Sequence, residues 1–441
     1  MSPTAIGLLM FAAMIALLVL RVPIAAAMFI PGAVGYWVLT SELSLLNLLK
    51  GSAVARLTVY DLSVIPLFLL MGQFATQGGL SRALFQAAAA FIGHIRGGLA
   101  MASVVSAGAF GAVCGSAVAT AATITQVAYP EMRKHGYSGR LSTGTLAVGG
   151  GLGILIPPSV PLVVYAILTE QNIAKLFAAA MVPGLLAMLM YAGVIWLMCR
   201  LQPHLASPSD ALPWRQRWRA FAGVWPILVI FVIVFGGIYG GIFSPTEGAA
   251  VGAVSTFVAG LLRRELTLAA IGRSFLGAAE TSAMVFMIFL GADMMNSTLA
   301  VTQLPMHLAD WVSHLEVSPL LILTCVLLFY VLMGCIMDEL SLVLLTIPVL
   351  FPAIMGLDLW GLGAEAKALW FGILILMTMG TGLISPPVGL NVYVVNGITK
   401  EVPLVETYKG VFPFLASDFV RLFLVLMFPS ISLGLMYWLY S

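Results

Sequence analysis

Two adjacent carboxylates interrupt an apolar stretch in the second half of the chain. Asp338 and Glu339 lie in "MGCIMDELSLVLLTIPVLFP", which begins at Met333. A carboxylate in a segment apolar enough for a membrane is costly, so it indicates function by default. Two roles fit Asp338: coordination of a cation, which we favour, and capping of the helix that follows. Glu339 fits a ligand role less well, because its position also suits a side chain that faces water.

Two Pro-Pro pairs lie in similarly apolar surroundings, in "GLGILIPPSVPLVVY" from Gly151 and "GTGLISPPVGLNVYV" from Gly380. Proline has no backbone N–H, so each pair leaves two carbonyls of the preceding helical turn without a donor. In the first segment these are the carbonyls of Gly153 and Ile154. Bare carbonyls are tolerated in a membrane only where protein, water or an ion meets them.

A hard cation such as Na⁺ takes oxygen ligands, which unwound backbone and nearby hydroxyl or amide groups can supply. One Pro-Pro pair alone is often only a kink, but two pairs at matching places favour a binding site. The nearest side-chain oxygens belong to Ser159, Thr381, Ser385 and Asn391. Glycines that permit unusual backbone and close approach are Gly149, Gly150, Gly151, Gly153, Gly380 and Gly382.

The composition shows which kind of elements must position these groups. Of the residues, 61% are hydrophobic and 9% are charged, and the mean hydropathy is +1.07. Soluble domains carry roughly 25% charged residues, so the chain is predicted to be a multi-pass membrane protein. Some apolar runs are long enough to span a bilayer and others are short, which indicates broken or re-entrant helices. The net charge of +2 is too small to indicate nucleic acid as a partner.

Proline positions indicate an internal duplication. Pro23 and Pro245 differ by 222 positions, as do Pro130 and Pro352. The Pro-Pro pairs, which begin at positions 157 and 386, differ by 229. We therefore predict an all-α protein with a first repeat over 1–200 (hairpin about 104–130, broken helix about 142–168), a basic linker over 201–219, and a second repeat over 220–441 (hairpin about 325–352, broken helix about 368–398).

Charges suggest that the repeats are inserted in opposite orientations. The linker is rich in arginine and is expected in the cytoplasm by the positive-inside rule. Equivalent loops of the two repeats carry opposite charge bias, as inverted repeats of a secondary transporter would. The first loop has Arg133, Lys134 and Arg140 against Glu131, and the second has Lys367 against Asp358 and Glu365.

The segment "FGAVCGSAVATAATITQVAYP", from Phe110, matches the segment that holds the two carboxylates. Its small residues suit either a tightly packed transmembrane helix or, better, a re-entrant hairpin with its tip at Cys114–Ser116. Ser116 falls 222 positions before Asp338. The two tips are therefore expected at equivalent places in the two repeats.

The chain resembles, over nearly its whole length, the large, DctM-like membrane subunit of tripartite ATP-independent periplasmic (TRAP) transporters. The resemblance lies in the paired hairpins and in the two break motifs "GLGILIPPS" and "GLISPPVGLN". The resemblance implies a sodium-driven importer of the bacterial inner membrane, in which a transport domain moves like an elevator against a scaffold. It also implies a small four-helix membrane subunit and a periplasmic substrate-binding protein as partners. Because the chain starts at "MSPTAIGLLM", the small subunit is expected to be a separate polypeptide.

The family's cation sites carry over to the hairpin tips and helix breaks. The resemblance implies one sodium site at Gly115 and Ser116 with the backbone around Gly151, Gly153 and Pro157. It implies a second at Asp338 with Gly380, Thr381, Gly382, Ser385 and also Asn391, and we expect Ser159 and Asn391 to contact the substrate. The substrate is expected to carry a carboxylate. Because neither break contains Arg or Lys, helix N-termini, hydroxyls and sodium are expected to hold that carboxylate.

Two other functions are compatible with parts of this pattern. A stand-alone sodium/carboxylate symporter would share the repeats but need no binding protein. A membrane enzyme is disfavoured because no histidine is close in sequence to Ser116 or Ser159. No organic cofactor is expected, and the four cysteines are expected to be packing residues, since their spacing does not suit a metal. The segment 41–61 fits either an amphipathic arm at the small-subunit interface or a connecting loop with one helical turn.

Overall fold

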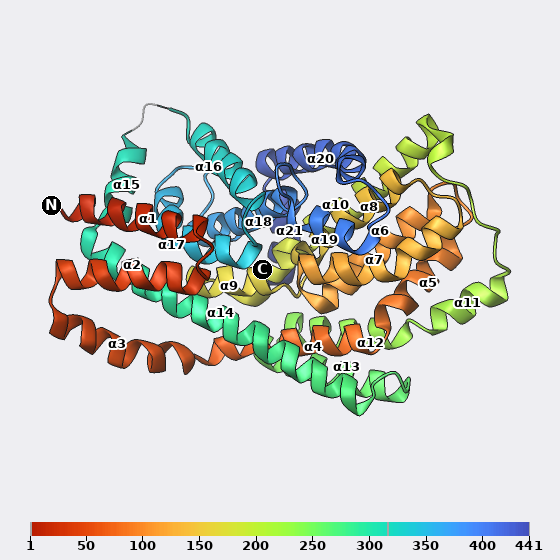
Figure 1. Cartoon of the computed structure of the whole chain (residues 1–441), viewed down its shortest axis with the longest axis horizontal. Coiled ribbons are helices and arrows are strands. Elements are labelled where there is room, and N and C mark those ends of the chain that lie inside the picture. Colours follow the sequence, from red (N-terminus) through yellow and green to blue (C-terminus); the bar gives the residue numbers. More distant parts are fainter. Residues whose placement is uncertain (1, 315–316, 441) are drawn as a thin grey trace.

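The computed structural model describes residues 2–314 and 317–440, and over these residues every regular element is a helix. Figure 1 shows an elongated molecule in which the first and second halves interleave. The predicted all-α class is therefore confirmed. The first half contains α1 (Pro3–Val19), α2 (Ile24–Leu39), α3 (Glu42–Leu57), the 3-10 turn η1 (Tyr60–Ser63), α4 (Val64–Gln77), α5 (Leu80–Ile92), α6 (Gly98–Cys114), α7 (Ala117–Lys134), α8 (Gly139–Leu155), α9 (Val160–Leu168) and α10 (Ile173–Leu201).

The second half repeats this order of elements after a linker. The linker contains η2 (Pro203–Leu205) and α11 (Trp214–Ala222). The second half contains α12 (Trp225–Tyr239), α13 (Pro245–Leu262), α14 (Leu268–Thr302), α15 (Leu304–Ser313), α16 (Pro319–Gly334), α17 (Glu339–Met355), α18 (Ala364–Gly382), α19 (Leu390–Thr399), α20 (Leu404–Met427) and α21 (Ser430–Tyr440).

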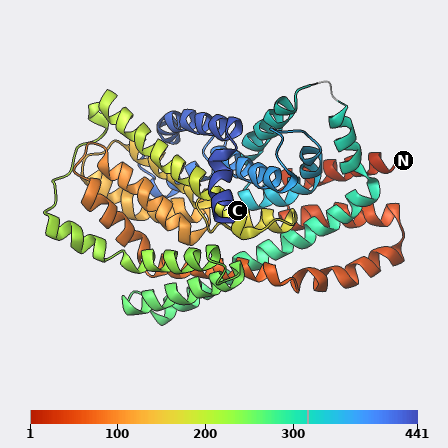
Figure 2. The same cartoon turned by 180° about the vertical axis from the view of Figure 1, so that it is seen from behind.

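Contacts between the halves are reciprocal. Helix α2 packs along α14, and α13, which occupies the place of α2 in the second half, packs along α4. Likewise, α19 packs on α7 and α9 packs on α17. Figure 2 shows the same interleaving from behind. Such an exchange places the second hairpin and break beside the first.

Membrane-spanning helices are present as the composition predicts. Six helices of the described residues are long and apolar enough to cross a bilayer, and up to eight if each of two bent pairs forms one span. The chain is therefore a multi-pass membrane protein. The spans that contain α8 and α18 are the most enclosed, since 83% of the most apolar window of each is buried. These two helices form the centre of the fold.

Both predicted hairpins and both predicted breaks appear as separate helices. Helices α6 and α7 meet at Gly115 and Ser116 and pack against each other, which agrees with the hairpin interpretation of this segment rather than with a single helix. Each hairpin and each broken helix extends a few residues beyond one or both of its predicted ends. The first hairpin, for example, covers residues 98 to 134. Capping residues such as Ser138, whose hydroxyl accepts from the N–H of Leu141, fix these ends.

The segment 41–61 forms a helical arm and not a loop with one turn. Its helix α3 has no buried residue and joins α4 through a bend of 57°. Arg56 on α3 forms a two-pronged ion pair with Asp293 on α14 and lies over the ring of Phe289. The arm is thus fastened to the long helix. Its contact with a small subunit stays a prediction.

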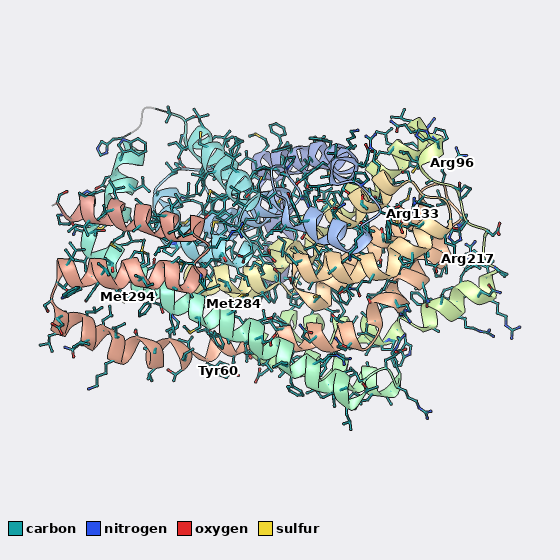
Figure 3. All side chains as sticks on the ribbon, viewed as in Figure 1. Tyr60, Arg96, Arg133, Arg217, Met284 and Met294 are labelled. Carbon is teal, nitrogen blue, oxygen red and sulfur yellow. The ribbon has the colours of Figure 1, made fainter. Side chains whose placement is uncertain are left out.

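Charged side chains gather at one end of the molecule. Figure 3 shows Arg96, Arg133 and Arg217 at the end that carries the linker helix α11. Lys367, which we counted as a loop charge, is instead buried, and its ammonium donates to the carbonyls of Met355 and Leu357 at the end of α17. It therefore caps a helix.

Candidate functional site

The first hairpin tip is shaped by a left-handed glycine and a hydroxyl cap. Gly115 ends α6 with φ of +68°, a conformation that side chains disfavour. Ser116 then begins α7, and its Oγ accepts a hydrogen bond of 3.5 Å from the N–H of Ala119. The hydrogen of this hydroxyl is therefore free to donate, and the start of α7 presents the positive end of a helix.

The first break follows α8 and contacts this tip directly. The peptide bond between Pro157 and Pro158 is cis, and the N–H of Val160 donates to the carbonyl of Gly115 at 3.3 Å. The hydroxyl of Ser159 is fully buried and has no hydrogen-bond partner among the described residues. It is not among the side chains that line the cavities described below, so its expected contact with substrate stays a prediction.

A close backbone crossing holds the first hairpin against the break. A Cβ built on Gly111 of α6 would lie 2.6 Å from the Cα of Gly153 on α8. A Cβ on Gly153 would lie 2.5 Å from Oγ1 of Thr120, a buried hydroxyl without a partner among the described residues. Thr120 follows Ser116 by one helical turn, and the sequence analysis missed it. Its spacing from Ser116 is the signal that could have indicated it.

In the second hairpin, Asp338 caps a helix. Its Oδ2 accepts from the N–H of Ser341 at 3.1 Å, and its Oδ1 accepts from the hydroxyl of the same serine. This is the capping role left open by the sequence. A carboxylate oxygen has further lone pairs, so capping still permits cation coordination, which stays a prediction.

The second break repeats the first in its backbone. The bond between Pro386 and Pro387 is cis, and the N–H of Gly389 donates to the carbonyl of Cys335 at 3.0 Å. A Cβ on Gly382 would lie 2.7 Å from the Cα of Gly334, which reproduces the crossing of the first half.

The hydroxyls of the second break keep their oxygen lone pairs available. Thr381 donates its hydroxyl hydrogen to the carbonyl of Met377 at 2.9 Å, and Ser385 donates to the carbonyl of Thr381 at 2.7 Å. Since their hydrogens are already used, these oxygens can only accept or coordinate.

The two breaks meet at the molecular centre. A Cβ on Gly151 would lie 3.8 Å from the carbonyl oxygen of Gly380, so the equivalent glycines of the two halves face each other. Asn391 of α19 is fully buried, and its amide donates to the carbonyl of Ala147 on α8 at 3.3 Å. The structure therefore places Asn391 against the first half, whereas we grouped it with Asp338. Its Oδ1 has no partner among the described residues.

A small cavity lies between the two hairpin tips and the long helices. This inter-tip cavity has a volume of about 110 Å³. Ser116 from the first tip and Glu339 from the second line it, and Gln73, Thr76 and Thr281 from α4 and α14 line the opposite wall. The site thus combines polar groups from both halves.

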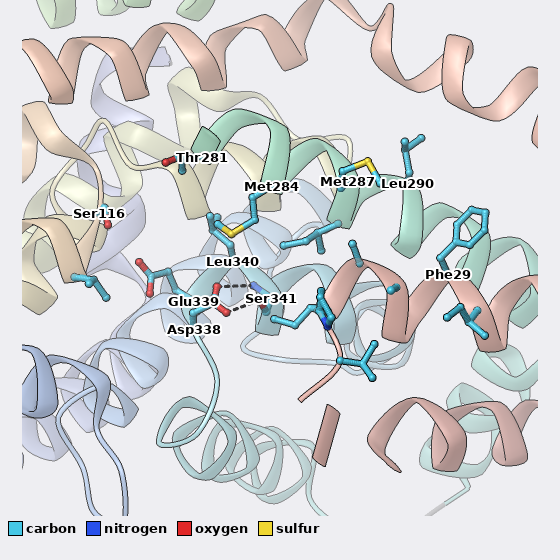
Figure 4. A pocket seen from close by; sticks show the side chains of 18 residues that line it. Phe29, Ser116, Thr281, Met284, Met287, Leu290, Asp338, Glu339, Leu340 and Ser341 are labelled. Carbon is cyan, nitrogen blue, oxygen red and sulfur yellow. Dashed lines mark hydrogen bonds between the residues drawn. The ribbon is translucent and has the colours of Figure 1, made fainter. Parts of the chain in front are cut away.

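A larger lateral cavity of about 1000 Å³ adjoins the tips between α2 and α14. Figure 4 shows Ser116, Asp338, Glu339 and Ser341 at one end of it and Phe29, Met287 and Leu290 at the other. No Lys or Arg lines either cavity among the described residues.

Glu339 is buried, which argues against the alternative of a side chain that simply faces water. Its side chain is 6% exposed and its carboxylate interacts with the backbone N–H of Ala117, at the start of α7. Sequence could not show this burial, because it depends on packing between residues more than 200 positions apart.

Cysteines and histidines do not form a metal centre in the part of the chain that the structure describes. Cys114, Cys199 and Cys335 are buried, as expected of packing residues. Cys325 is exposed on α16, so the packing role predicted for it is wrong.

Comparisons with known proteins agree on one family. The family model described as "Tripartite ATP-independent periplasmic transporter, DctM component" matches residues 11–431. The chain is 38% identical over 383 residues to the C4-dicarboxylate TRAP transporter large permease protein DctM of Pseudomonas aeruginosa, covering 86% of this chain and 87% of that protein. It is 34% identical over 449 residues to the protein of the same name from Rhodobacter capsulatus. This match covers 97% of this chain and 98% of that protein. Both relatives are named as permease proteins and not as enzymes.

A solved structure shares the fold. The crystal structure of the Alcanivorax borkumensis YdaH transporter, whose topology is described as unusual, superposes with a TM-score of 0.62 at 16% identity. The match covers 90% of this chain and 89% of that chain. At this identity the likeness concerns the fold alone.

Proposed function

Because the chain belongs to the family of DctM components of tripartite ATP-independent periplasmic transporters, we propose that it imports a carboxylate-bearing solute across the bacterial inner membrane by sodium symport. It is a transporter subunit and not an enzyme. The carboxylate is suggested by the relatives from Pseudomonas aeruginosa and Rhodobacter capsulatus, which are named for C4-dicarboxylates.

The observation that carries sodium coupling is the duplicated tip-and-break unit. In each half an unwound segment beside two prolines is hydrogen-bonded to a hairpin tip. The first unit offers Ser116 and backbone oxygens, and the second offers Asp338, Thr381 and Ser385. Oxygen ligands without sulfur suit Na⁺, which would order both tips and so complete the inter-tip cavity for substrate. Each ligand then favours the state that the other stabilises, which couples their transport.

An elevator movement is supported by the uneven packing around the tips. The lateral cavity separates the tips from α2 and α14, and its walls are largely apolar side chains such as Phe29, Met284 and Met287. Apolar walls without interlocking ion pairs allow one body to slide past another. In the proposed mechanism the hairpins and breaks form the transport domain, and α1 to α4 with α12 to α14 form the scaffold.

Two partners follow from the tripartite family, a small membrane subunit and a periplasmic substrate-binding protein. We propose that the small subunit is a separate polypeptide that packs against the scaffold. The alternative of a stand-alone symporter would need no binding protein.

Uptake into proteoliposomes tests the proposal. The chain and its small subunit are reconstituted together, and entry of radiolabelled succinate, malate and aspartate is measured with and without an inward sodium gradient and with and without the binding protein. Uptake that requires both supports the proposal. Sodium-driven uptake without the binding protein would indicate the stand-alone symporter, and uptake indifferent to sodium would refute the coupling.

A further inference from the structure

One buried side chain at the meeting point of the hairpins has an oxygen without a partner. Glu339 is the first residue of α17 and is 6% exposed. Its Oε2 is buried and has no hydrogen-bond partner among the described residues, and the Glu339 residue lines the inter-tip cavity. A buried carboxylate oxygen left unpaired is costly, so a donor from outside the chain is expected to meet it.

The two neighbouring carboxylates point to different places. Figure 4 shows Asp338 joined to Ser341 by two hydrogen bonds, whereas Glu339 extends toward Ser116 of the other tip. The N–H of Ala117 at the start of α7 interacts with the Glu339 carboxylate. The positive end of that helix favours a negative charge. Glu339 is thus held as an acceptor between the two halves.

Two of the three polar side chains on the opposite wall present only acceptors, and the third, Gln73, carries both an acceptor and a donor. Thr281 donates its hydroxyl hydrogen to the carbonyl of Gly277 at 2.9 Å, and Thr76 donates to that of Gly72 at 2.8 Å. Both oxygens therefore present lone pairs to the cavity and not hydrogens. A solute in this space needs donors on the side that faces Glu339 and these threonines.

We propose that Glu339 selects the substrate by accepting a hydrogen bond from an O–H or N–H group of the solute. The site would then prefer carboxylates that carry a hydroxyl or amino substituent over unsubstituted ones. A donor group satisfies Oε2, whereas an unsubstituted dicarboxylate leaves it unpaired. This inference rests on the proposed import of a carboxylate and adds the chemical class of that solute.

Three probes with one carbon skeleton test this selectivity: succinate, malate and aspartate, which carry hydrogen, hydroxyl and ammonium at the same carbon. The chain purified with its small subunit is titrated with each probe in sodium chloride, and dissociation constants are taken from the shift in thermal unfolding midpoint. The binding protein is left out, so its own selectivity does not enter. We expect malate or aspartate to bind at least about tenfold more tightly than succinate.

Variants assign the preference to Glu339. Glu339→Gln should raise the dissociation constant of the preferred probe by about tenfold or more. The dissociation constant of succinate should change by less than about threefold. Glu339→Asp, which keeps the charge and the acceptor, should keep the order of the probes and covers the case in which the glutamine variant does not fold. Glu170→Gln makes the same chemical change on an exposed turn and should leave all three constants unchanged.

Three results would overturn the inference: succinate binding as tightly as both substituted probes, no stabilisation by any probe, or a preference that survives Glu339→Gln. Its failure is distinguishable from failure of the proposed function. Uptake that needs sodium and the binding protein would uphold the function even if the probes showed no order. Uptake without sodium would refute the coupling even if Glu339 set the preference.

Discussion

The two hairpin tips are built on the same backbone frame but carry different chemistry. In each half one backbone hydrogen bond ties the break to the tip, from Val160 to Gly115 and from Gly389 to Cys335. The first tip then presents a neutral hydroxyl, Ser116, and the second presents two carboxylates. Backbone geometry is thus common to both halves, whereas charge belongs to one of them. We infer that the frame makes the sites and that the side chains divide the tasks between them.

The scaffold elements of the two halves differ in shape. The first half bends by 57° between α3 and α4, whereas its counterpart α14 runs unbroken for 35 residues. The bent element leaves an exposed arm and the straight one supplies a continuous wall for the tips. The scaffold is therefore less symmetric than the transport elements it surrounds.

Disrupting the close backbone crossings should have the largest effect on uptake and stability. The size of this effect should be the same in both halves. Gly153→Val and Gly382→Val each place a side chain where backbone or a buried hydroxyl already lies, at a cost on the order of 3 kcal/mol. We expect loss of nearly all uptake and lower unfolding midpoints. Gly193→Ala, where a Cβ meets nothing within 4 Å, is the matched control. If one crossing tolerated valine, the equivalence of the frames would be disproved.

Neutralising the second tip should have the next largest effect. Asp338→Asn keeps an oxygen for the helix cap but removes the charge, and should raise the sodium concentration for half-maximal uptake by about tenfold. Asp358→Asn, on an exposed loop, is the control and should leave the dependence of uptake on sodium concentration unchanged. An unchanged sodium curve for folded Asp338→Asn would limit this residue to capping.

A substitution in the first tip should change the sodium dependence of uptake less than one in the second tip, because the first tip carries no charged side chain. Ser116→Ala removes the cap of α7, which is worth about 1 kcal/mol, and one oxygen of the proposed first sodium site. We expect the half-maximal sodium concentration to rise by about fivefold, with recovery in Ser116→Thr. A shift as large as that of Asp338→Asn would show that charge does not distinguish the tips.

The arm should show the smallest effect. Arg56→Ala removes the ion pair to Asp293. The side chain of Arg56 is 26% exposed and that of Asp293 is 19% exposed, so the loss should lower the free energy of unfolding by about 1 kcal/mol. The exchanged pair Arg56→Asp with Asp293→Arg should recover part of this loss. A double-mutant cycle on thermal unfolding measures the coupling, and a coupling of zero would mean that packing alone fastens the arm.

The sequence by itself determined the elements that proline, glycine and apolar runs dictate. Pro157 and Pro386 lack N–H groups, so each Pro-Pro pair predicted a break in the helix near its place. The run of small residues around Ser116 and the constant offset to Asp338 likewise located both tips within a few residues. Local chemistry suffices for such features, because the missing donors and the spacing are properties of the chain itself.

Only the tertiary structure decided how these elements meet. Glu339 is buried because α17 of the second half packs against α9 of the first and against α14. Lys367 caps a helix that ends 12 residues earlier. Asn391 similarly bonds to Ala147, 244 positions away. Burial and hydrogen-bond partners depend on contacts between distant segments, and the exchange of helices between the repeats brings those segments together. The sequence therefore located the candidate ligands, while the fold determined which of them share a cavity.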